Sequence, residues 1–437
     1  MSGKKEPIKS IDIIELAMKI LEKYPLCDHC LGRQFARLGL DLGNDERGKA
    51  IKTILAMRLH HELKKEVINK DVLRRFALHG GDPITRLYSK IYEEEIKPYQ
   101  CYVCGGKLSK KYFEEIAERM VSLLNEYNAY TFLVGVSLPQ EVMLRELEVA
   151  SMHGLETSES IKNEIKREIG KIVRDKYGFT PDFTYPDIVV IVDYETNELR
   201  PVVNPILLEG RYWKRGRNIS HTIWISSRGV KEYPYSLEEF FNDNLKGLFN
   251  AERVVLHASG REDVDARMLG TGRPMVIEIK NPRFRYVDLS LVNYVLKSPL
   301  IEAEITSYSS RSRIGYLKGE GSKKMKAYKV LVYCEKQINN EELHRLEEFF
   351  KNKAIKQRTP TRILRRKKDY LRIRKVYEVK TLKLSNHVFE VVIYCDGGLY
   401  VKELVHGDSG RTSPSFAEFL GAYTYPLELD VFAVETK

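Results

Sequence analysis

Apolar residues recur at helical spacing through much of the N-terminal half of the chain. Residues 11–24 and 112–127 each carry a single apolar stripe, and residues 45–66 are predicted to form a helix with one basic face. The clearest stripe lies within residues 158–176 and consists of Ile161, Ile165, Ile169 and Val173. Apolar runs at 131–138, 187–193 and 199–208 predict strands between and after these helices, which indicates a small α/β domain.

Beyond residue 245 the pattern changes to runs of strand length. Predicted strands lie at 275–280, 301–306, 328–334, 376–383, 388–395 and 399–405, with one helix near 341–356. A polar, turn-rich stretch separates the two halves, so we place a domain boundary near residue 240. The fold class is therefore α+β, with an N-terminal α/β domain followed by a second domain on a mixed, mostly antiparallel sheet.

Length and charge narrow the class of protein. The chain has 437 residues, more than the ~250–300 that one core usually serves, so two or more domains are expected. No apolar run is long enough for a bilayer span and the N-terminus has no apolar signal core, which predicts a soluble, cytoplasmic protein with no membrane partner. The net charge of +11 favours a polyanionic partner such as a nucleic acid.

Four of the six cysteines form two Cys-x-x-Cys pairs, Cys27 with Cys30 and Cys101 with Cys104. Two such pairs can supply a tetrahedral thiolate site, and thiolates favour zinc. The 70 residues between the pairs weaken this signal, because compact zinc ribbons use shorter spacers. Disulfides and a redox pair are the alternatives, and an intracellular compartment disfavours disulfides. We expect a structural zinc site, because four cysteine ligands leave no open position for a catalytic water.

Three basic segments are candidates for contact with RNA. Residues 209–224 interleave basic and aromatic side chains, which suits single-stranded RNA, although a basic rim on a strand edge explains them equally well. Residues 306–326 form a long loop that could clamp phosphates, and residues 358–375 hold nine Lys and Arg. The residues predicted to bind RNA are Arg211, Lys214, Arg215, Arg217, Arg311, Arg313, Arg358 and Arg362.

Residues 260–274 combine carboxylates, guanidinium groups and glycines. Asp263 and Asp265 lie between Arg261 and Arg267 in a glycine-rich setting. Flanking cations can keep a carboxylate ionised and oriented, as a carboxylate nucleophile requires. A structural ion-pair turn explains the same composition, and this segment alone favours that interpretation.

Three separated segments together resemble the motifs of pseudouridine synthases. Residues 260–263 read Gly-Arg-Glu-Asp and resemble the Gly-Arg-x-Asp catalytic loop of that family. Residues 327–332 resemble its second motif, a tyrosine on a strand, and residues 400–404 resemble its third. The longer forms of these segments are similar to the archaeal and eukaryotic tRNA pseudouridine synthases with an N-terminal zinc-bearing THUMP region, and the resemblance covers the whole chain.

The resemblance implies a role for each matching residue. Asp263 would be the nucleophile, and Tyr328 would lie against the target uracil. The Gly-Arg-x-Asp register selects Asp263 over its neighbour Asp265, for which we expect a supporting ion pair. The other implied substrate-site residues are Tyr400, Lys402 as the basic partner of the aspartate, Leu404 in the pocket wall, and Arg261. Lys402 and Arg261 carry the positive charge that keeps Asp263 ionised.

The resemblance also implies a domain layout and a substrate. Residues 1–110 would form a helical segment with the zinc cysteines, 60–240 a THUMP-type RNA-binding region and 245–437 the catalytic domain. The substrate would be tRNA, isomerised at uridines 54 and 55 of the T-loop, with no organic cofactor, no guide RNA and no obligate protein partner.

Two other function classes remain open at this stage. A THUMP-bearing tRNA thiouridylase would need a phosphate loop of consecutive small residues, and Arg261 and Val264 occupy two of those positions. A non-catalytic tRNA-binding protein fits the charge and the aromatic content, but leaves three ordered motifs unexplained. A THUMP methyltransferase is disfavoured further, because the chain has no glycine-rich cofactor loop.

Overall fold

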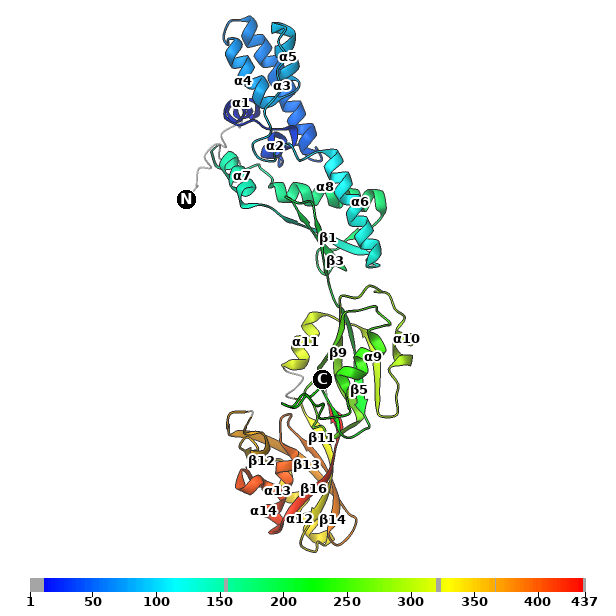
Figure 1. Ribbon diagram of the computed structural model, residues 1–437. Helices are drawn as coiled ribbons and strands as arrows, with labels where there is room; N and C mark the ends of the chain where they lie inside the picture. Colours follow the sequence, from blue (N-terminus) through cyan, green and yellow to red (C-terminus); the bar gives the residue numbers. More distant parts are fainter. Residues whose placement is uncertain (1–11, 153–155, 320–323, 366, 435–437) are drawn as a thin grey trace, which may run out of the picture. The chain divides into compact units, whose positions relative to one another are not determined.

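The computed structural model describes residues 12–152, 156–319, 324–365 and 367–434, and the chain forms two compact units (Figure 1). The first unit is Met1–Asn204 and the second is Pro205–Lys437. The division therefore falls about 35 residues before the predicted boundary near 240. The reason is strand β5 (Ile206–Lys214), which pairs with strands of the second unit on both of its sides.

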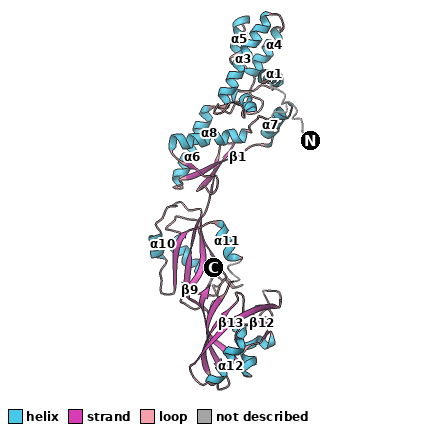
Figure 2. Cartoon of the chain, turned by 180° about the vertical axis from the view of Figure 1, so that it is seen from behind, coloured by secondary structure: helices cyan, strands magenta, loops and turns pink. Residues whose placement is uncertain are grey.

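The first unit combines a helical part with a small sheet. Its helices are α1 (Ile13–Lys23), α2 (Asp28–Gly32), the 3₁₀ turn η1 (Arg33–Phe35), α3 (Asn44–Lys64), α4 (Lys70–Gly80), α5 (Ile84–Tyr92), α6 (Lys110–Glu126), α7 (Gln140–Met152) and α8 (Ile161–Tyr177). The sheet has the order β2 (Thr180–Pro181), β1 (Thr131–Ser137), β3 (Ile188–Asp193) and β4 (Leu199–Val203). Helices and strands are distinguished by colour in Figure 2.

Capping residues and buried stripes explain where these helices lie. The Asp12 carboxylate accepts from the amides of Ile14 and Glu15 at the start of α1, both at 3.0 Å. Ser160 caps α8 in the same way, and Gly178 ends it in a left-handed conformation with φ of 77°. The predicted stripe of α8 is fully buried, which confirms the helical interpretation of its period.

The second unit is built on one large sheet. Its strand order is β10 (Ile301–Tyr308), β5, β9 (Arg267–Lys280), β16 (Thr424–Val434), β11 (Lys326–Cys334), β14 (Val388–Cys395), β13 (Arg372–Lys383), β12 (Lys353–Gln357) and β15 (Thr412–Ser413), with β8 (Arg253–Ala258) also paired to β9. Only β16 and β9 pair in parallel among these described strands, so the predicted mixed, mostly antiparallel sheet is confirmed.

The remaining elements of this unit surround the sheet. They are the short strands β6 (Ile219–Ser220) and β7 (Tyr235–Ser236) and the helices α9 (Leu237–Leu245), α10 (Leu289–Val295), α11 (Arg311–Lys318), α12 (Asn340–Phe350), η3 (Thr361–Ile363), α13 (Val401–His406), η4 (Gly407–Gly410) and α14 (Phe416–Leu420). The two main buried apolar clusters of this unit are formed by α9 and α10 with β5, β8, β9 and β10, and by α12, α13 and α14 with β11, β13 and β14.

Three sequence predictions about local structure were wrong. The single strand predicted at 199–208 is two strands in different sheets, β4 and β5, separated at Pro205. The strand predicted at 399–405 is helix α13, because Val401, Leu404 and Val405 are spaced at i, i+3 and i+4 and bury one helical face. The loop predicted at 306–326 contains helix α11, and its residues 320–323 lie outside the described residues.

Candidate active site

The aspartate loop lies between the end of β8 and the start of β9. Gly260 has φ of 76°, and a Cβ at this position would lie 3.2 Å from Lys326 Nζ, so the turn requires glycine. The Ser259 amide donates to the Pro274 carbonyl at 3.0 Å, and the Ala266 amide donates to the Asp263 carbonyl at 3.0 Å. The loop is therefore a closed turn with Asp263 near its tip.

A buried polar network supports this loop from behind. Lys214 Nζ donates to the carbonyls of Asp263 at 3.1 Å and Val264 at 3.2 Å. The Glu262 carboxylate accepts from Arg273 Nε at 2.9 Å and from the Tyr212 hydroxyl at 3.0 Å. Since the Lys214 side chain is only 1% exposed, its prediction as an RNA-binding residue was wrong. It holds the backbone of the aspartate loop instead.

Burial and charge shift the pKa values of this network. Burial acts to raise the pKa of Glu262, but the Arg273 guanidinium and the Lys214 ammonium lower it overall. Burial lowers the pKa of His221 to about 4 and, together with the charge of Arg273, lowers that of Lys326 to about 8. The network therefore holds a carboxylate in its ionised form beside a neutral imidazole.

Two cations contact the carboxylate of Asp263. Arg362 Nη2 lies 3.2 Å and Lys402 Nζ 3.4 Å from the same oxygen, Oδ2. Lys402 is closer to Asp265, at 2.8 and 2.7 Å from its two oxygens. Burial acts to raise the pKa of Asp265, and the hydrogen bonds from Lys402 outweigh it and lower that pKa. Arg261 is exposed, and no ion pair joins it to Asp263 in the described part of the chain, so Arg362 occupies the place expected for Arg261.

The two motif tyrosines lie on elements outside the aspartate loop. Tyr328 lies on β11, and burial raises the pKa of its phenol, which keeps the hydroxyl protonated. Tyr400 precedes α13, and its backbone exchanges two hydrogen bonds of 2.9 Å with the buried side chain of Gln357. Leu404 is fully buried in the core cluster of α12, α13 and α14. Asp263, Tyr328 and Lys402 thus come together from three segments that are far apart in the sequence.

Most of the other predicted RNA-binding residues are engaged in contacts within the protein. Arg211 donates to the Thr271 and Gly272 carbonyls, and Arg217 ion pairs with Glu428 and Asp430. Further ion pairs join Arg215 to Glu302, Arg313 to Glu209 and Arg358 to Asp369, while Arg311 is an exposed residue of α11. Strand β5 lies inside the sheet, so the alternative interpretation of residues 209–224 as a strand-edge rim was wrong for this strand.

The four paired cysteines converge in the first unit. All four sulfur atoms lie within 4.8 Å of one another, and the sulfurs of Cys27 and Cys104 are 3.5 Å apart. Two thiolates on one zinc ion at ~2.3 Å lie about 3.8 Å apart, so this cluster has suitable dimensions for one tetrahedral ion. Cys30, Cys101 and Cys104 are buried, and the amide of Cys30 approaches the Cys27 sulfur at 3.5 Å. The four cysteines can therefore hold a metal.

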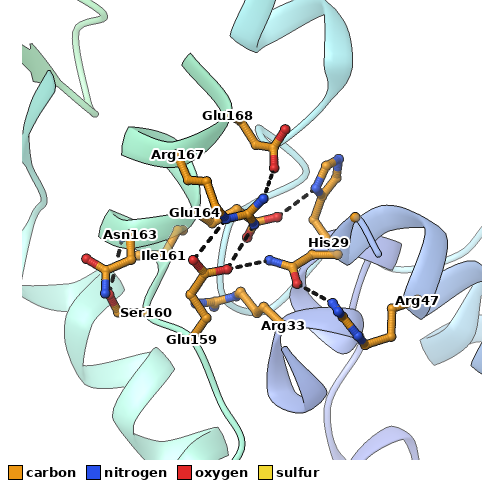
Figure 3. Close-up of polar contacts among 12 residues, drawn as sticks. His29, Arg33, Arg47, Glu159, Ser160, Ile161, Asn163, Glu164, Arg167 and Glu168 are labelled. Atoms are coloured by element: carbon orange, nitrogen blue, oxygen red, sulfur yellow. Dashed lines mark hydrogen bonds and ion pairs between the residues drawn. The ribbon is translucent and has the colours of Figure 1, made fainter. Parts of the chain in front are cut away.

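Polar contacts connect helix α2, which carries Cys30, to the segment around α8 (Figure 3). His29, between the first two cysteines, places Nδ1 2.8 Å from the Glu164 carboxylate of α8. Asn44 donates to Glu159 at 2.8 Å, and Arg167 of α8 ion pairs with the same carboxylate at 3.0 Å. Charged contacts consequently join the helices beside the cysteine cluster to the α/β part of the first unit.

Comparison with models of protein families shows to which family the chain belongs. Residues 207–435 match the family model described as Pus10, C-terminal, and residues 116–193 match that described as Pus10 THUMP domain, archaeal. The chain belongs to the Pus10 family. The sequence-based recognition of a tRNA pseudouridine synthase with a THUMP region is thereby confirmed.

Full-length relatives agree with the family models. A tRNA pseudouridine synthase Pus10 of Thermosphaera aggregans is 46% identical over 98% of this chain and 98% of that protein. Those of Ignisphaera aggregans and Methanocaldococcus jannaschii are 41% and 38% identical, over 97% and 95% of this chain and 99% and 93% of theirs. A solved Cbf5-Nop10-Gar1 complex aligns with 52% of this chain and 47% of that chain at 15% identity, with a TM-score of 0.28, too low to support an argument.

Sequence reasoning missed two residues of the site in this Pus10-family chain. Arg362 was assigned to RNA contact, but it contacts Asp263, and Glu403 was not singled out although it binds Arg362. The position of Glu403 directly after Lys402 was the available signal, since a buried acidic residue beside a site lysine needs a cationic partner. None of the described helices is long and apolar enough to cross a bilayer.

Proposed function

We propose that this chain is a cytoplasmic tRNA pseudouridine synthase that isomerises uridines 54 and 55 of the T-loop, with Asp263 as its nucleophile. The observation that carries the proposal is the carboxylate of Asp263, which is 38% exposed on a fixed turn and has two cations on one of its oxygens. A carboxylate that is oriented by cations and open to a substrate is suited to nucleophilic attack.

The reaction needs a carboxylate and a base-binding surface but no co-reactant. The glycosidic bond from C1′ to N1 breaks, the uracil rotates, and a bond from C1′ to C5 forms, while C5 loses a proton and N1 gains one. The target nucleotide must leave its stack and be held by aromatic contact. We assign that contact to Tyr328. Tyr400, the first residue of the third motif, is a second substrate contact. The protonated hydroxyl of Tyr328 can take part in proton transfer near C5.

We assign a structural zinc ion to the four cysteines and tRNA binding to the THUMP region. Four thiolates provide the ligand set that zinc favours and leave no position for a reacting water. Zinc there would fasten the helices that carry the ligands, and no catalytic step depends on it. Arg311 and the outward guanidinium groups of Arg215 and Arg358 are the remaining candidates for phosphate contacts in the second unit.

The test uses an unmodified tRNA transcript and purified enzyme. Wild-type protein should convert uridines 54 and 55, mapped by carbodiimide-dependent stops in primer extension, whereas Asp263→Asn should convert neither and still bind the tRNA. Conversion by Asp263→Asn at the wild-type rate would remove the aspartate from its role. Wild-type protein that modifies neither uridine would contradict the proposed substrate.

A further inference from the structure

One guanidinium joins two carboxylates at the candidate active site. Arg362 Nε donates to Glu403 Oε1 at 2.8 Å, and Nη2 of the same group lies 3.2 Å from Asp263 Oδ2. We propose that Arg362, oriented by Glu403, is a positioning residue that fixes the rotation of the Asp263 carboxylate so that Oδ1 faces the target nucleotide. This inference rests on the proposed function, since it takes Asp263 as the nucleophile.

Burial of the Glu403 carboxylate makes its contact with Arg362 important for the stability of the site. Its side chain is only 2% exposed, and within the described residues its second oxygen, Oε2, has no hydrogen-bond partner. A buried carboxylate with one unsatisfied oxygen depends strongly on the cation at its other oxygen. The hydrogen bond from Nε is charge-assisted and directional, so it fixes the plane of the guanidinium and the direction of Nη2.

The backbone that carries Arg362 is fixed independently of Glu403. The amide of Thr361 donates to Asp408 at 2.9 Å, and Arg411 donates to the Thr359 carbonyl at 3.0 Å. Thr359 is fully buried. The 3₁₀ turn η3, which holds Arg362, is therefore anchored to the turn that follows α13, so Arg362 and Glu403 belong to one rigid local structure.

Both cations at Asp263 contact the same carboxylate oxygen. Arg362 and Lys402 approach Oδ2 at 3.2 and 3.4 Å, and no hydrogen bond or ion pair to Oδ1 occurs among the described residues. Two cations on one oxygen, one from η3 and one from α13, oppose rotation of the carboxylate, whereas Lys402 is shared with Asp265. Arg362 is thus the cation that distinguishes the two aspartates, since the ion pair found for Asp265 is with Lys402.

The competing role for Arg362 is a contact with a tRNA phosphate, since its side chain is 42% exposed. The two roles predict different kinetics. A phosphate contact contributes to affinity and to its salt dependence. A positioning contact acts on the chemical step, where a displacement of about 1 Å can cost about 100-fold in rate.

The experiment compares Arg362→Lys, Glu403→Gln and the control Arg345→Lys, an exposed arginine of α12. Lysine keeps the charge of residue 362 but has one ammonium, which cannot bridge both carboxylates through a planar fork. Each variant is measured with unmodified tRNA for its single-turnover rate at saturating enzyme, its dissociation constant and the salt dependence of that constant. Tryptophan-fluorescence melting checks that each variant is folded.

We expect Arg362→Lys to lower the single-turnover rate about 10- to 100-fold, with the dissociation constant and its salt slope unchanged. Glu403→Gln should lower the rate in the same direction by a smaller factor, and the two changes combined should cost less than the product of their separate effects. Arg345→Lys should match the wild type. Glu403→Gln retains the residue volume, so it tests the proposal even where Arg362→Lys folds poorly.

Other outcomes would overturn the inference without touching the proposed function. A wild-type single-turnover rate for Arg362→Lys, with weaker binding and a smaller salt slope, would make Arg362 a phosphate contact. A wild-type rate for Glu403→Gln would remove Glu403 from its role. Asp263→Asn is measured in parallel, and activity in that variant would contradict the nucleophile itself, which keeps the two failures distinct.

Discussion

Replacing Lys326 with methionine is expected to stabilise the second unit near pH 7 and to change how its stability depends on pH. Lys326 is the first residue of strand β11 and is only 7% exposed. Burial, and then the nearby guanidinium of Arg273, lower its pKa from 10.5 to about 8. The folded protein therefore carries an ammonium group in an unfavourable place, and methionine fills similar space without the charge.

The size and sign of the effect follow from this pKa. A fall from 10.5 to about 8 corresponds to about 3 kcal/mol of destabilisation while both states are protonated, that is, below about pH 8. Between about pH 8 and 10.5 the unfolded chain binds more protons than the folded one, so the contribution of Lys326 to stability rises with pH. Methionine should gain up to about 3 kcal/mol at pH 7 over the wild type, and this advantage should vanish near pH 10.5.

Urea unfolding followed by tryptophan fluorescence measures this difference. The chain has two tryptophans, Trp213 and Trp224, and both lie in the second unit, so the signal reports on that unit. Comparison of the two proteins at several pH values cancels the titration of all other groups. A gap in the free energy of unfolding that stays constant from pH 7 to 10.5, or no gap at pH 7, would refute the reasoning.

Three further predictions concern the aspartate loop and the cysteine cluster. Asp265→Asn should lower the isomerisation rate about 10-fold without abolishing it, because Lys402 still contacts Asp263, and a rate as low as that of Asp263→Asn would contradict this. Gly270→Ala should destabilise the second unit by more than about 3 kcal/mol in a melting experiment, because φ is 54° and the new Cβ would lie 1.9 Å from a carbonyl oxygen of β16; an unchanged melting temperature would contradict this. Cys104→Ser should lose bound metal by mass spectrometry and increase amide exchange at the start of α8, and a full metal content would argue against the assigned ligands.

How far the sequence predicted this molecule depends on whether a feature is local. The stripe of α8 and the strands β1, β3, β11 and β14 follow from periodicity, because each buries one face along most of its length. Helix α13 did not follow, since six residues carry too little pattern to separate a helix from a strand. The predicted position of the domain boundary differs from the structure for a related reason. Only the long-range pairing of β5 with β9 and β10 assigns this strand to the second unit.

In the candidate site, too, the sequence predicted the local motifs but not all the contacts that single side chains make. The motifs predicted that Asp263, Tyr328 and Lys402 belong together, and the structure brings them from β8–β9, β11 and α13. Charge alone could not tell which basic residues face outward. Lys214 is buried behind the loop and Arg362 reaches the aspartate, although both occupy segments whose composition suited RNA contact.

Positive charge exceeds negative charge in the buried polar network behind the Asp263 loop. Three cations, Lys214, Arg273 and Lys326, lie near one buried carboxylate, that of Glu262. The remaining positive charge raises the electrostatic potential near the loop, and a positive potential attracts a polyanion. Weakening that group, as in Lys326→Met, should therefore stabilise the fold and slow tRNA association at low salt.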